Sequence, residues 1–118
     1  MEKQALVNIA FTQNWNNKFN CDYFSFITLH NPDQYTIGRK YHIITGGITD
    51  ISGTITAASR IKLPQITDAL AFLDCGQNAA FLKRYLMQLY PNELPDHDLG
   101  LYIIRNDDRF WLRGIMGK

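Results

Sequence analysis

The sequence is poor in cysteine and contains no long apolar run. Its 118 residues include two cysteines, Cys21 and Cys75, which lie far apart and form no CxxC pair. No stretch approaches the roughly 20 apolar residues that a membrane-spanning helix needs. The first residues include an early acidic side chain and a short, interrupted apolar segment, which argues against a secretory signal. We therefore expect a reduced, cytoplasmic protein with no membrane partner, and one disulfide between the two cysteines stays open as an alternative.

The chain also lacks an excess of charge of either sign. Twelve basic and 11 acidic residues give a formal net charge of +1. No overall attraction to nucleic acid follows, so a nucleic-acid partner would have to be bound by a local group of basic residues. The histidines and cysteines have no zinc-site spacing, and no glycine-rich phosphate loop is present. Neither a metal nor a cofactor is expected.

Apolar and aromatic residues are sufficient for one core. They make up 46% and 13% of the chain, which predicts a single domain over residues 1–118. Asn78 is the expected cap of a long helix that ends at Pro91. The pattern of apolar and turn residues predicts strands over 5–11, 23–30, 39–45, 54–62, 99–105 and 109–115, helices over 12–20, 66–73 and 79–90, and turns at 46–47, 52–53 and 106–108.

The most informative segment is residues 26–43, FITLHNPDQYTIGRKYHI. It predicts a strand, a loop that Pro32 keeps out of any ladder, and a tight turn at Gly38 before the next strand. This segment resembles the start of the ASCH family, a branch of the PUA-like superfamily of small β-barrels linked to RNA. Segments 54–68, 81–91 and 101–104 resemble the small bacterial ASCH-type amidohydrolases that remove the acetyl group from N4-acetylcytidine.

The resemblance implies an α+β fold. In this fold a small PUA-like, mainly antiparallel β-barrel of five to six strands carries two to three helices packed at its side. It also implies a ligand cleft between the barrel and the helices. The predicted function is a non-catalytic ASCH-type module that binds RNA or a modified nucleoside in this cleft. Two alternatives stay open: an amidohydrolase acting on N4-acetylcytidine-like substrates, and a phage-associated protein-interaction domain that kept the fold.

The amidohydrolases use a lysine as base, a threonine as nucleophile and a glutamate as proton relay. The resemblance places the threonine at Thr28 and the acid near Asp74, while the lysine position holds Ser25 in one register and Tyr23 in another. His30 shares a strand face with Thr28, so it is the substitute base that the residues offer. The ordinary interpretation, a strand threonine and a solvated histidine, is stronger. We expect Thr28 and Asp74 to face one cavity.

A local group of basic residues offers a second candidate site. Its cations can contact phosphates, and tyrosine rings beside them can stack on unpaired bases. We expect the four cations on one side of the barrel, and the competing interpretation is ordinary surface charge over an aromatic core. The candidate residues are Arg39, Lys40, Arg60 and Lys62, with Tyr35 and Tyr41 as the stacking faces.

Overall fold

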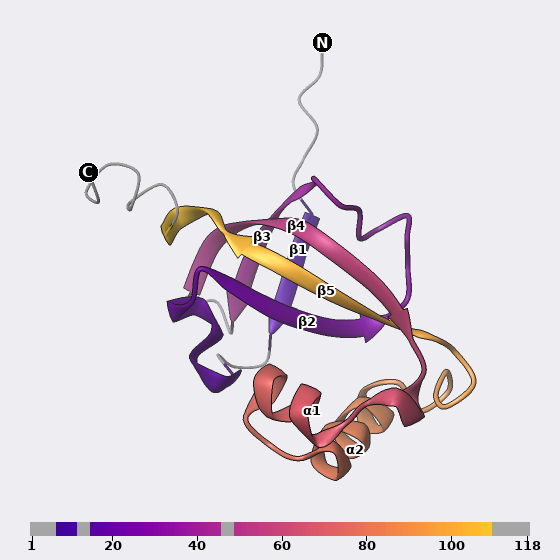
Figure 1. The fold of residues 1–118 in the computed structure, drawn as a ribbon. Coiled ribbons are helices and arrows are strands. Elements are labelled where there is room, and N and C mark those ends of the chain that lie inside the picture. Colours follow the sequence, from indigo (N-terminus) through magenta and orange to yellow (C-terminus); the bar gives the residue numbers. More distant parts are fainter. Residues whose placement is uncertain (1–6, 12–14, 46–48, 110–118) are drawn as a thin grey trace.

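The computed structural model describes residues 7–11, 15–45 and 49–109 (Figure 1). Within these ranges the fold consists of strands, two α-helices and two short 3₁₀ helices, which confirms the α+β class. The elements in chain order are β1 (Val7–Phe11), η1 (Trp15–Asn20), β2 (Tyr23–Leu29), β3 (Lys40–Thr45), β4 (Thr49–Ile61), η2 (Leu63–Gln65), α1 (Asp68–Cys75), α2 (Ala79–Leu89) and β5 (Leu99–Asn106).

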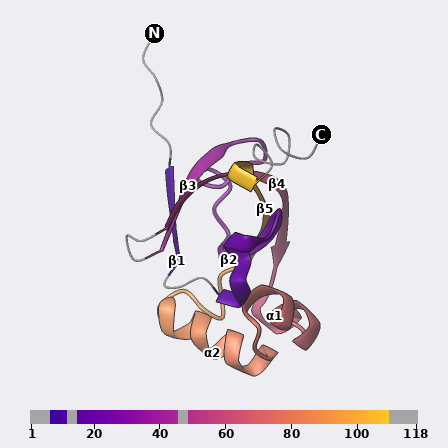
Figure 2. The same ribbon diagram turned by 90° about the vertical axis from the view of Figure 1, so that its left-hand side faces the viewer.

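The described strands form one mixed sheet with the order β1-β3-β4-β5-β2. β1 runs parallel to β3, and every other neighbouring pair is antiparallel. β1 and β2 are therefore the two edge strands, and no ladder joins them in the described part of the chain. Figure 2 shows the sheet curving, with α1 and α2 side by side beneath it.

One predicted turn is wrong because its glycine has a packing role. Residues 52–53 lie inside β4, which continues from Thr49 to Ile61. Gly53 is buried, and a Cβ atom at this position would lie 2.6 Å from Ile104 Cγ2. The absence of a side chain leaves room for the Ile104 and Ile43 side chains, which pack over this position. The predicted turn at Gly38 does form, with φ of 90°, and the predicted turn at 46–47 lies outside the described residues.

The predicted hairpin at 106–108 is also wrong. β5 ends at Asn106, and residues 107–109 are helical. Asn106 is 1% exposed; its side-chain amide donates to the Phe19 carbonyl at 3.1 Å and its Oδ1 accepts from the Arg109 N–H at 3.3 Å. This asparagine caps a helical turn instead of starting a hairpin. The rest of the strand predicted over 109–115 lies outside the described residues.

Two apolar clusters lie on opposite faces of the sheet. The first is rich in aromatic side chains and fills the concave face, with Phe11, Phe24, Tyr41 and Tyr102 at its centre. The second packs the other face of β2 and β5 against α1 and α2. Phe24 and Phe26 contribute to the concave face, whereas Ile27 belongs to the helix side. This alternation follows the two-residue period of a strand.

Caps fix the corner between the two helices. Thr67 accepts from the Leu70 N–H at 3.2 Å at the start of α1, and Gly76 ends α1 with φ of 75°. Asn78 caps α2 as predicted, accepting from the Phe81 N–H at 2.9 Å.

Cys21 is exposed and Cys75 is buried, and no disulfide joins them. No helix in the described ranges has the length and hydropathy that a bilayer crossing requires.

Candidate functional site

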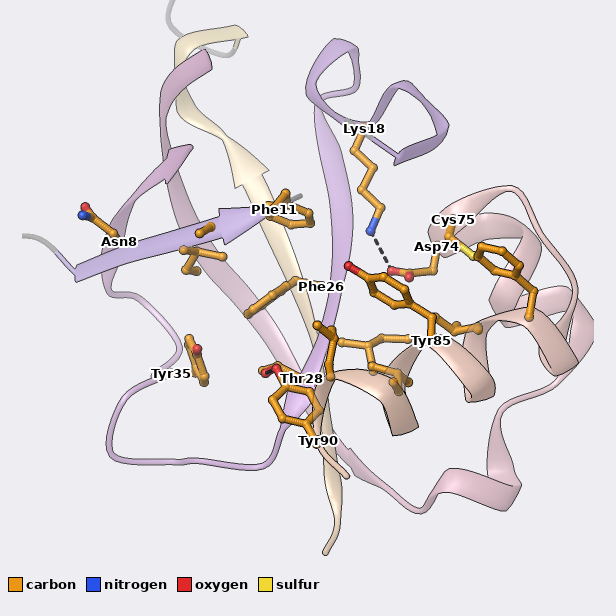
Figure 3. Close-up of a pocket in the computed structure, with 17 residues that line it drawn as sticks. Asn8, Phe11, Lys18, Phe26, Thr28, Tyr35, Asp74, Cys75, Tyr85 and Tyr90 are labelled. Carbon is orange, nitrogen blue, oxygen red and sulfur yellow. Dashed lines mark hydrogen bonds and ion pairs between the residues drawn. The ribbon is translucent and has the colours of Figure 1, made fainter. Parts of the chain in front are cut away.

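A cavity of about 240 Å³ lies between the two edge strands and α2 (Figure 3). Residues 8–11 of β1 and 26–28 of β2 border it as uninterrupted runs. Successive side chains of a strand point to opposite faces, so a continuous run borders one cavity only where the cavity lies at the edge of the strand. The cavity therefore occupies the gap between the free edges of β1 and β2, and we call it the seam cavity.

Aromatic side chains form the walls of the seam cavity. Phe11 and Phe26 come from the two edge strands, with ring centroids 5.3 Å apart. Phe81 and Tyr85 come from α2 and are partly buried. In Figure 3 the sheet rings and the Tyr85 ring stand on different sides of the space. Such walls favour a flat, apolar-faced ligand.

A buried ion pair forms one polar end of the cavity. Lys18 on η1 and Asp74 on α1 are 4% and 5% exposed. Lys18 Nζ donates to Asp74 Oδ1 and to the Ser25 carbonyl, both at 2.8 Å, and Ser25 Oγ donates to the same Asp74 oxygen at 2.6 Å. Burial lowers the pKa of Lys18, and the Asp74 carboxylate partly offsets this effect.

Neutral hydroxyl groups form a second polar region. Thr28 Oγ1 and the Tyr90 hydroxyl are 2.7 Å apart, within hydrogen-bonding distance. Burial raises the pKa of Tyr35 to about 12, and the neighbouring tyrosines add to the effect. Tyr35 is therefore a neutral hydroxyl group at pH 7. Figure 3 shows Thr28, Tyr35 and Tyr90 in one part of the view and Lys18 with Asp74 in another.

The structure brings two of the three predicted catalytic residues together. Thr28 and Asp74 both line the seam cavity, as expected from the sequence. His30 is not among the lining residues, and no hydrogen bond joins it to Thr28 in the described part of the chain. The His30 Nδ1 atom is buried without a hydrogen-bond partner. The Thr28 hydroxyl interacts with Tyr90 instead.

The four predicted phosphate-binding residues form two separate groups. Lys40 lies opposite Thr54 in the ladder, and Arg60 follows six residues later on β4, which places the groups about 20 Å apart. Lys40 Nζ is 4.0 Å from an Asp107 oxygen. Arg60 and Lys62 both bind Asp98, with the Lys62 contact at 2.9 Å. Nearby carboxylates thus partly neutralise both groups.

The predicted stacking tyrosines are not surface rings. Tyr41 is fully buried; its hydroxyl donates to the Gln34 carbonyl at 2.8 Å and accepts from the Thr36 N–H at 2.9 Å. It offers no ring face to a base, which corrects this part of the prediction. The Arg39 guanidinium lies 5.7 Å from the centre of the Tyr41 ring and covers it. Tyr35 is partly buried and lines the seam cavity.

Lys18 is the site residue that sequence reasoning missed. The ASCH-type amidohydrolases have their lysine inside the strand, where this chain has Ser25 in one register and Tyr23 in the other. Lys18 lies seven residues earlier, on η1, and reaches Asp74 across the end of β2. A signal was present, because Lys18 is the only charged residue between positions 4 and 21. Tyr90, the partner of Thr28, directly follows α2 and carried no such signal.

No group of three or more His, Cys, Asp or Glu side chains within the described ranges is arranged to hold a metal ion. Comparison with family models, with curated proteins and with solved structures finds no match to this chain.

Proposed function

We propose that this chain is a cytoplasmic, ASCH-like module of the PUA-like type that binds a nucleoside in the seam cavity, either free or as one unit of an RNA strand. In this proposal the curved sheet corresponds to the barrel of that superfamily, and the seam cavity is its ligand cleft. The observation that carries the proposal is an aromatic-walled cavity with a buried ion pair at one end and neutral hydroxyl groups at the other.

The chemistry of the cavity suits a base. Planar heterocycles have apolar faces that stack on aromatic rings and polar edges that need hydrogen bonds. The seam cavity supplies both kinds of contact. Its volume of about 240 Å³ is below the roughly 300–1,000 Å³ that drug-sized ligands occupy, which favours one nucleoside over a larger ligand.

The surface charges support recognition through the base more than through phosphates. Counterion release gives strong salt dependence only where free cations contact several phosphates. Lys40, Arg60 and Lys62 already lie close to carboxylates. A nucleoside carries no phosphate charge, so we expect its affinity to change little between low and moderate salt.

Calorimetric titration with cytidine, uridine, adenosine and guanosine tests the proposal. About 17 non-hydrogen atoms at about 0.3 kcal/mol each give about 5 kcal/mol, a Kd of about 0.2 mM. Ala10→Trp tests the location of binding, because Ala10 is exposed on β1 and lines the cavity, so a large side chain there fills it. Ala58→Trp is the matched control, an exposed alanine on β4 that does not line the cavity.

We expect at least one nucleoside to bind with sub-millimolar affinity, and we expect Ala10→Trp alone to weaken it by about tenfold or more. Binding that Ala10→Trp and Ala58→Trp leave equally strong would place the ligand outside the seam cavity. Absence of binding by all four nucleosides at millimolar concentration would contradict the proposal.

One observation favours a second candidate, an amidohydrolase. The cavity holds a lysine, an acid and a threonine, the three residue types that the amidohydrolases use, with Lys18 in place of the missing strand lysine. Burial lowers the pKa of Lys18 and moves it toward the neutral amine that can accept a proton.

The hydrogen bonds of the site favour binding over hydrolysis. A threonine nucleophile needs an adjacent base, but the groups that interact with the Thr28 hydroxyl in the described structure are the hydroxyls of Tyr90 and Tyr35. We expect no acetate release from N4-acetylcytidine above the uncatalysed rate. Release that Thr28→Val abolishes and that Ala58→Trp preserves would establish the enzyme instead.

A further inference from the structure

The backbone hydrogen bonds of β2 follow a strict alternation. In an antiparallel ladder, one residue directs both its N–H and C=O to the partner strand, and the next directs both away from it. Two bonds extend the pattern at the ends of the β2–β5 ladder. The Asn106 N–H donates to the Asp22 carbonyl at 2.7 Å, and the His30 N–H donates to the Asp98 carbonyl at 3.0 Å.

The register then shows, for every residue of β2, whether its backbone N–H and C=O point toward β5 or away from it. Phe24, Phe26 and Thr28 continue the even-numbered series that bonds β5. The odd-numbered residues must direct their backbone groups to the free edge. Ser25 confirms this assignment, because its carbonyl accepts from Lys18 and not from β5.

Ile27 is the odd-numbered residue that borders the seam cavity. β2 is an edge strand, so no described strand pairs with Ile27 on this side. Its N–H donor and C=O acceptor therefore face the cavity next to the Phe26 ring and the Thr28 hydroxyl. At the preceding odd-numbered residue, Ser25, the Lys18 ammonium already binds the edge carbonyl. A backbone donor and acceptor shielded from bulk water favour a ligand that pairs with both.

We propose that the backbone N–H and C=O of Ile27 form hydrogen bonds with the ligand and thereby select it. The class of ligand is a planar heterocycle with a hydrogen-bond acceptor next to an N–H donor on one edge, as in the ring nitrogen and amino group of cytosine or adenine. The inference rests on the proposed function and adds the group that selects the base. The free N–H and C=O of an edge strand can form hydrogen bonds with the acceptor and donor of such a heterocycle, as they would with a neighbouring strand.

Amide hydrogen exchange of the ¹⁵N-labelled full chain tests this inference. Without ligand, the Ile27 amide should exchange at least about tenfold faster than the ladder-bonded amides of Phe26 and Thr28. Saturating cytidine should slow Ile27 exchange by about tenfold or more and shift its amide proton downfield. Leu29 is the matched control, because its amide lies on the same edge but does not line the cavity. Its exchange should not change.

Two cytidine analogues test the ligand edge. 3-Deazacytidine lacks the ring acceptor, and N4,N4-dimethylcytidine lacks the amino donor. Each should bind about tenfold more weakly than cytidine, because one hydrogen bond is lost.

The outcomes separate the two proposals. Resonance shifts at Thr28 and Tyr85 with an unchanged Ile27 amide would overturn this inference and leave the proposed function standing. An Ile27 amide that is as protected as Phe26 and Thr28 without ligand would overturn the inference whatever binds. If none of the four nucleosides shifts any cavity resonance, the proposed function fails, and this inference fails with it.

Discussion

Removing the Asp74 carboxylate should strongly destabilise the fold. Asp74→Ala leaves the Lys18 ammonium 4% exposed and without its counter-ion, and it leaves the Ser25 hydroxyl without its acceptor. Breaking a buried ion pair at one partner commonly costs about 3–5 kcal/mol. Because domains unfold with about 5–15 kcal/mol, this is a large part of the total stability.

Urea denaturation followed by circular dichroism at pH 7 measures this loss. With an m-value of about 2 kcal/mol per molar urea, a loss of about 4 kcal/mol lowers the midpoint by about 2 M. The double variant Lys18→Met/Asp74→Leu is the control, because it removes both charges and keeps apolar volume. It should recover more than half of the loss, since replacing a buried pair by apolar groups is often nearly neutral.

The pH dependence gives a second readout with a defined sign. Burial lowers the native pKa of Lys18, so the unfolded state binds more protons between that pKa and the ordinary value of 10.5. Stability therefore rises with pH in this window. Asp74 raises the pKa of Lys18, so without Asp74 the pKa of Lys18 in the folded protein falls further. The pH range in which stability rises then extends to lower pH. The deficit of Asp74→Ala relative to wild type should be smaller at pH 9 than at pH 7.

Two results would refute this reasoning. One is a loss below about 1 kcal/mol in Asp74→Ala, which would show that the pair is hydrated in solution. The other is a double variant as unstable as the single one, which would show that the charge on Lys18 is not the cause.

Thr28, Gly53 and Tyr35 each allow a direct test by substitution. Thr28→Val should cost about 1–2 kcal/mol in urea denaturation, and a cycle with Tyr90→Phe should show coupling, whereas additive losses would exclude the hydrogen bond. Gly53→Ala should cost about 1–3 kcal/mol because its Cβ would lie 2.6 Å from Ile104; a neutral effect would mean that β4 and β5 separate easily. In a spectrophotometric titration one tyrosine should ionise near pH 12, and Tyr35→Phe should remove that step; its persistence would reassign the shifted group.

The local signals of this sequence predicted most of the elements. Apolar and β-branched residues gave β1, β2, β3 and β5 within two positions, whereas β4 begins five residues before its predicted start. Asn78 and Pro91 marked the ends of α2, because capping groups and a missing N–H act over a few residues. The two errors had a common physical cause. Gly53 and Asn106 both carry turn chemistry, but the contact with Ile104 and the bond to the Phe19 carbonyl gave them tertiary roles.

The candidate site was only partly predictable. The resemblance pointed to Thr28 and Asp74, and the structure places both at one cavity. Neither composition nor spacing could show that η1 turns Lys18 toward Asp74, 56 positions later, because this contact depends on the packing of η1 and α1 against β2. The same holds for Tyr90 beside Thr28, where the path of α2 decides the contact.

The sequence by itself determined the α+β class and the near balance of charge, since these follow from residue types and short-range periodicity. The tertiary structure alone decided that β1 and β2 become the two edges of a curved sheet. It also decided that residues of both edges border one cavity. Strand order and curvature come from pairing between distant segments and from packing of the whole core, which no local pattern specifies.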